Sequence, residues 1–151
     1  MIQAQNQKIV KIGFAEALID DASLTTDYID LSGWDYAQVY VYLGTTDIAA
    51  TVLKIQDCAT SGGSYADVTG LIWGTSANIA GTTSTLPSAT NDGTFFLFDI
   101  DCRQVDRFID LVATMGNGTA GGFISAFAIL SRGEATPVTA SERGATEILR
   151  V

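Results

Sequence analysis

The chain has 151 residues, of which 47% are apolar and 17% charged, and it carries a formal net charge of −9 with a pI near 4.1. This length predicts one domain that buries its own core. The low charged fraction predicts a surface partly covered by other copies or by a partner. No apolar run approaches the roughly 20 residues that span a bilayer. The start, MIQAQNQKIV, lacks the pattern of a signal peptide, so we expect no membrane partner and synthesis in a bacterial cytoplasm.

The charge is unevenly distributed along the chain. Residues 1–11 contain Lys8 and Lys11 and no acidic residue, whereas residues 12–131 contain three basic and fourteen acidic residues. An acidic body repels phosphate, so we expect no nucleic-acid partner. The basic beginning either docks on an acidic neighbour or is a solvated tail, and both interpretations remain open.

The first half of the chain reads as three strands separated by polar turns. An alternating run covers residues 8–19, and a break follows at DDASLTTD. Residues 35–43 alternate cleanly, as do residues 50–57 beyond a turn at GTTD. In residues 50–57 Leu53 and Ile55 share one face. In residues 35–43 two faces separate, one of Ala37, Val39, Val41 and Leu43 and one of Tyr36, Gln38, Tyr40 and Tyr42.

The second half adds a long loop and three further strands. Residues 58–67 are expected to form a Gly/Ser loop, and residues 70–93, the least regular stretch, are either a long loop or paired short strands. Strands are predicted at 94–101, 107–115 and 121–131, with a helical turn at DCRQVD and a hairpin at GNGTAGG. Residues 101–115 also fit an amphipathic helix, but their β-branched and aromatic content favours a strand.

Short strands at this spacing predict an all-β protein, an antiparallel β-sandwich or jelly roll. We expect a β-sandwich domain at residues 12–131, an N-terminal arm at 1–11 and a C-terminal arm at 132–151. The last arm ends in EILRV, so Ile148, Leu149 and Val151 are expected to bury against something.

Residues suited to catalysis or metal binding are few. There is no histidine, and no nucleophile or phosphate-binding motif occurs. Asp99 and Asp101 lie on one strand face, but an adjacent pair at a strand end does not flank a cleft as glycosidase carboxylates do. Cys58 and Cys102 form no CxxC motif, and free thiols suit a reducing cytosol better than one disulfide does. We expect a protein that is not an enzyme and needs no cofactor.

The aromatic row is the strongest candidate for a binding site. Tyr36, Tyr40 and Tyr42 share one face of a strand, and Trp34 and Trp73 are available to join them. Such rows stack on sugar rings in carbohydrate-binding modules. Tyrosine also suits half-wet interfaces, so the same face is compatible with packing on a second sheet or on a neighbouring subunit, which we favour.

Residues 28–70 carry a resemblance to a known family. An Asp-hydrophobe-Gly turn leads to a strand that ends in Leu-Gly, followed by TVLKIQD, a Gly/Ser loop and SYADV. This pattern resembles the jelly-roll capsid decoration proteins, or cement proteins, of tailed bacteriophages. A late strand pair at 107–131 extends the resemblance more weakly.

The resemblance implies a structural role without catalytic residues. Such proteins bind the outside of the capsid, often as trimers, and bridge subunits of the major capsid protein. It therefore implies a virion location. We expect contacts through Lys8 and Lys11, through Tyr36, Tyr40 and Tyr42, and through Ile148, Leu149 and Val151. A carbohydrate-binding or adhesin module on a virion or cell surface is the alternative.

Overall fold

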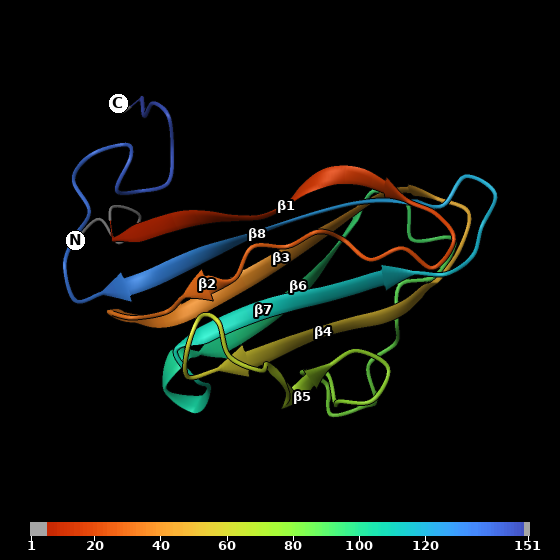
Figure 1. Cartoon of the computed structure of the whole chain (residues 1–151), viewed down its shortest axis with the longest axis horizontal. Coiled ribbons are helices and arrows are strands. Elements are labelled where there is room, and N and C mark those ends of the chain that lie inside the picture. The colour runs from red at the N-terminus through yellow and green to blue at the C-terminus, as the bar shows by residue number, and fades with distance from the viewer. Residues whose placement is uncertain (1–5, 150–151) are drawn as a thin grey trace.

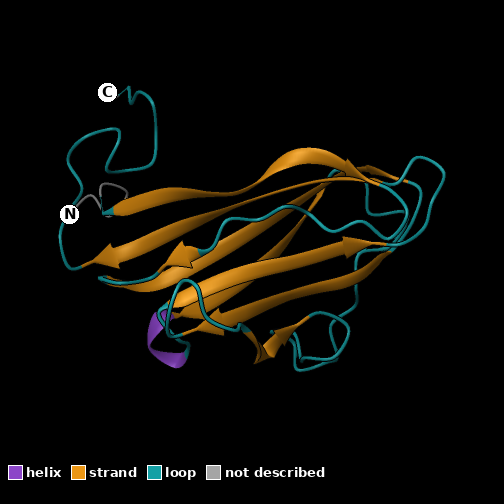
Figure 2. Ribbon diagram, viewed as in Figure 1, coloured by secondary structure: helices purple, strands orange, loops and turns teal. Residues whose placement is uncertain are grey.

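A computed structural model describes residues 6–149, and about half of them lie in β-strands, with almost no helix (Figures 1 and 2). A short 3₁₀ helix, η2 (Cys102–Gln104), occupies the predicted helical turn. Within the described residues no helix is long and apolar enough to cross a membrane. The strands are β1 (Gln7–Leu18), β2 (Ile29–Asp30), β3 (Trp34–Thr46), β4 (Ala50–Cys58), β5 (Ala66–Ile72), β6 (Thr94–Asp101), β7 (Phe108–Met115) and β8 (Gly122–Gly133).

The strands form two antiparallel four-stranded sheets. Sheet A has the order β1-β8-β3-β6, and sheet B has the order β2-β7-β4-β5. Consecutive strands alternate between the sheets except for β4 and β5, which pair with each other. Two four-stranded sheets connected in this order form a jelly roll, so the predicted fold class is confirmed.

The core lies between the two sheets and follows the predicted alternation. The apolar face of β3 is buried, with each of its four side chains at most 1% exposed, and Leu53 and Ile55 of β4 face it from sheet B. The strands alternate buried and more exposed positions because only one face of each sheet meets the other sheet. The predicted turn at GTTD begins later than expected, since β3 continues to Thr46.

The glycine-rich segment GNGTAGG does not form the predicted hairpin. It connects β7 of sheet B to β8 of sheet A, so it crosses from one layer to the other. Asp47 fastens it to the β3–β4 loop: its carboxylate accepts from the Ala120 amide at 2.7 Å, and its amide donates to the Gly121 carbonyl at 3.1 Å. Alternation reports which face of a strand is buried but not which strand lies beside it, so the sequence misled here.

The two ends of the described chain meet beside β1. Residues 7–11, expected in an N-terminal arm, are instead the first residues of β1, and residues 1–5 lie outside the described residues. The segment after β8, expected as a C-terminal arm, has no strand or helix in its described part, up to Leu149. That segment returns along the edge of β1, where the Ile9 amide donates to the Arg143 carbonyl at 2.9 Å (Figure 1).

Candidate interaction surface

The tyrosine row of β3 lies on the outer face of sheet A. Tyr36, Tyr40 and Tyr42 alternate with the buried Ala, Val and Leu residues of the same strand, which face sheet B. Packing of the tyrosines between the two sheets, one of the interpretations left open above, is therefore wrong. The row faces outward, where another subunit or a ligand can reach it.

Neighbouring strands enlarge the row into a continuous patch. Tyr40 lies between Phe127 of β8 and Leu97 of β6, and Tyr42 lies opposite Phe95. The Tyr40 and Phe127 rings stack with centroids 5.2 Å apart and planes 7° apart, and the Tyr42 and Phe95 rings are 4.9 Å apart. We define the aromatic face as Tyr40, Tyr42, Phe95, Leu97, Phe123 and Phe127.

Much of the aromatic face is exposed. Phe95 is 60% exposed, Phe123 48% and Tyr42 39%. Single exposed apolar residues are ordinary, but a contiguous group on one sheet face marks a site of protein or ligand binding. The sequence interpretation missed Phe95, Leu97, Phe123 and Phe127, although the same two-residue alternation in 94–101 and 121–131 places them on the face opposite the core.

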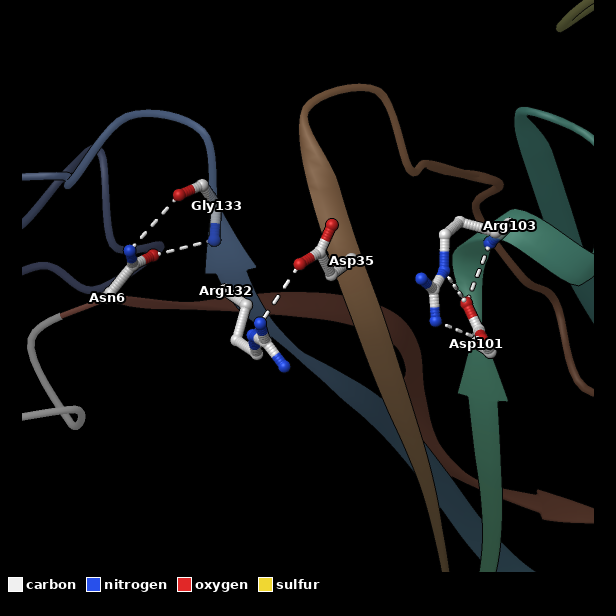
Figure 3. Close-up of polar contacts among 6 residues, drawn as sticks. All are labelled: Asn6, Asp35, Asp101, Arg103, Arg132 and Gly133. Carbon is white, nitrogen blue, oxygen red and sulfur yellow. Dashed lines mark hydrogen bonds and ion pairs between the residues drawn. The ribbon is translucent and has the colours of Figure 1, made fainter.

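Two ion pairs, drawn in Figure 3, lie near Tyr36 at one end of the tyrosine row. Arg132 is the last but one residue of β8, with its guanidinium 5.5 Å from the Tyr36 ring centre, and it pairs with Asp35 at 3.5 Å. Arg103 pairs with Asp101 at 2.7 Å and holds the pKa of that carboxyl at about 2. An apolar centre with a polar rim is the usual anatomy of a protein–protein interface.

The two lysines of the predicted basic patch lie on different faces of β1. Lys11 is paired in register with the outward residue Phe127, its ammonium lies 4.1 Å from the Phe14 ring centre, and it forms an ion pair with Asp27 at 3.3 Å. Lys8 pairs in register with Leu130, which points into the core. The structure therefore does not bring Lys8 and Lys11 together.

The predicted C-terminal contacts lie apart from the aromatic face. Leu149 is 97% exposed and Ile148 is 38% exposed, so neither is buried within its own chain as an anchored arm requires. Val151 lies outside the described residues. The side chains of Ile148 and Leu149 are available to another molecule.

A groove of about 420 Å³ lies beside β6, the edge strand of sheet A. Trp73 packs edge-on against Phe96, with ring centres 5.2 Å apart. The other wall is the loop after β5, held by the Ser84 hydroxyl, which donates to the Ser76 carbonyl at 2.7 Å. The groove is lined by Gly70, Leu71, Ile72, Trp73, Ser76, Ala77, Asn78, Ile79, Ser84, Phe95, Leu97, Phe98 and Asp99.

The groups with catalytic or metal-binding chemistry remain dispersed. Asp99 accepts a hydrogen bond from the Gln38 amide at 2.8 Å, while Asp101 is occupied by Arg103 and the start of η2. Cys58 and Cys102 are free, half-buried thiols, and burial raises the pKa of Cys102 to about 11. Among residues 6–149 no three acidic, cysteine or histidine side chains gather as a metal site.

Comparison with known proteins adds no family assignment. No protein-family model matches the chain, and no similar sequence is found among curated proteins.

Proposed function

We propose that this protein is a structural protein of a bacteriophage virion, which decorates the outside of the capsid and bridges neighbouring capsid subunits. It acts as an oligomer, a trimer by the resemblance above, and it performs no catalysis. The observation that carries the proposal is the exposed aromatic face on the jelly roll. Hydration of these large rings is unfavourable, so a partner that covers the face gains free energy by removing them from water.

The composition of the face supports protein binding. Aromatic residues dominate binding energy at interfaces because they remove a large apolar area from water with few rotatable bonds. Phe95 and Phe123 lie on the two strands that flank β3, so the patch spans three neighbouring strands. A patch of this breadth suits docking onto a shell surface.

The charge of the molecule supports a protein partner over nucleic acid. The chain carries a net charge of −9, and Lys11, the lysine beside the aromatic face, is already paired with Asp27. Such a surface repels phosphate and favours a neutral or basic neighbour.

Binding to purified particles tests the proposal. The protein should be present at a fixed high copy number per particle, and particles stripped of it should rupture at a lower temperature. Phe123→Ser should abolish rebinding to stripped particles. Val138→Ser is the matched control, because Val138 is 80% exposed but lies in the C-terminal segment. Equal rebinding by both variants, or absence of the protein from particles, would refute the role.

Carbohydrate binding is the second candidate, favoured by the exposed rings of Phe95 and Tyr42 beside a groove that also contains Asn78 and Asp99. Sugars stack on free ring faces, and one face of Tyr40 is already covered by Phe127. A glycan array with wild-type protein and Tyr42→Ala tests it: binding that Tyr42→Ala removes while the oligomer persists would favour this function over the first.

A further inference from the structure

The outer edge of β6 is open. β6 pairs with β3 along one side over Thr94–Asp101, and no backbone hydrogen bond to its other side occurs within residues 6–149. Its sequence, TFFLFDID, is mostly apolar and contains neither proline nor lysine, and its two charged residues, Asp99 and Asp101, lie in its last three positions, so Thr94–Phe98 has no charge to protect the edge. An eight-residue unpaired edge is a template on which another extended segment can add as a strand.

The groove described above lies along this edge. Its lining includes Leu97, which points outward, and Phe98, which points into the core, so the hollow follows the edge of the strand rather than one face of the sheet. Trp73 forms part of its wall, with its ring 6.2 Å from that of Phe98. The space is therefore placed to receive both the backbone and the alternating side chains of an added strand.

One exposed carboxylate without an ion-pair partner among the described residues lies at the groove. Asp99 is exposed and accepts only from the neutral Gln38 amide, and it forms no ion pair within the described residues. An added strand that carries a basic residue at this point would complement it. The chain contains such a segment at its C-terminal end, TEILRV, with Arg150 following the exposed residues Ile148 and Leu149.

The donor and the acceptor lie at opposite edges of sheet A. The C-terminal segment lies beside the start of β1, which is one edge strand, and β6 is the other edge strand (Figure 1). The groove lies along β6. We propose that residues 146–151 of one copy add as a parallel strand to β6 of a second copy. In that register Leu149 lies beside Phe98 in the groove, Ile148 beside Leu97, and Arg150 beside Asp99.

This arrangement has a consequence for symmetry. Because the donor and acceptor surfaces differ, the contact is head-to-tail, and it closes into a ring if the rotation between copies permits. The inference deepens the proposed function, since it rests on the self-association included there and identifies the segment that causes it. It requires no capsid partner for its test.

The molecular mass of the full-length protein and four variants, measured by native mass spectrometry and light scattering, tests the inference. Removal of residues 146–151 should give a monomer. Asp99→Arg and Arg150→Asp should each weaken association on the order of tenfold or more, and their combination should restore it, because the charges are exchanged. Val138→Ser should leave association unchanged. Circular dichroism verifies that each variant folds; none of the described residues that the deletion removes, 146–149, lies in a strand.

A mixing experiment discriminates further. The truncated chain keeps its acceptor, and Asp99→Arg keeps its donor, so mixing the two should yield a one-to-one heterodimer. A monomeric wild type, an unchanged oligomer after truncation, or no restoration in the exchanged pair would each overturn the inference. Particle rebinding is measured in parallel. A truncated monomer that still binds capsids separates this result from the capsid role, and an oligomer that never binds them contradicts only that role.

Discussion

Two phenylalanines of β6 provide a matched test of which face of sheet A is the core. Phe98 is 3% exposed and points between the sheets, whereas Phe95 is 60% exposed and belongs to the aromatic face. Phe98→Ala removes a fully packed ring and leaves a cavity, so it should lower the free energy of unfolding by about 4 kcal/mol. In a chain of this length that corresponds to a decrease in Tm of about 8–16 °C.

The cost of Phe95→Ala should be much smaller. Only the remaining two-fifths of the ring is buried, which is worth about 1 kcal/mol, and loss of the ring contacts with Tyr40 and Tyr42 adds up to about 1 kcal/mol. Urea unfolding, monitored by circular dichroism over a range of protein concentrations, measures both variants. If both substitutions lower the free energy of unfolding equally, and neither loss depends on protein concentration, the assignment of faces is refuted. Burial of Phe95 by self-association would make its loss depend on concentration, so it could not explain such a result.

Further predictions concern single positions. Gly121→Ala should destabilise by at least about 2 kcal/mol in urea unfolding, because Gly121 has a φ of +73° and its added Cβ would collide with the Leu18 carbonyl, whereas Gly62→Ala, with open space around it, should be nearly neutral. Because the pKa of Asp101 is lowered to about 2, the contribution of this carboxylate to stability is complete above the unfolded-state pKa near 4 and is lost as pH falls through about 2. Arg103→Gln should raise the Asp101 pKa toward 4 in an NMR titration. An unchanged pKa would contradict the pairing. The Cys102 thiol, with its pKa raised to about 11 by burial, should resist iodoacetamide at pH 8 until the protein unfolds, and rapid alkylation of the native protein would contradict its burial.

Local patterns in the sequence predicted most strands and their buried faces. Alternation in residues 35–43 and 50–57 identified the core residues of β3 and β4, because a strand between two environments must alternate with period two. Composition alone led us to expect no nucleic-acid partner, from the acidic charge, and no catalysis, from the lack of histidine.

Tertiary structure decided which strands are neighbours. GNGTAGG fits a hairpin by its residues, yet it crosses between sheets, and the tyrosine row fits an inner face, yet it lies outside. Long-range pairing also brought Phe95 and Phe127 beside the β3 tyrosines and put the C-terminal segment and the open edge of β6 on opposite sides of sheet A. Side-chain periodicity encodes the direction in which each residue points, whereas the partner of a strand depends on contacts between residues far apart in the chain, and no short segment specifies those.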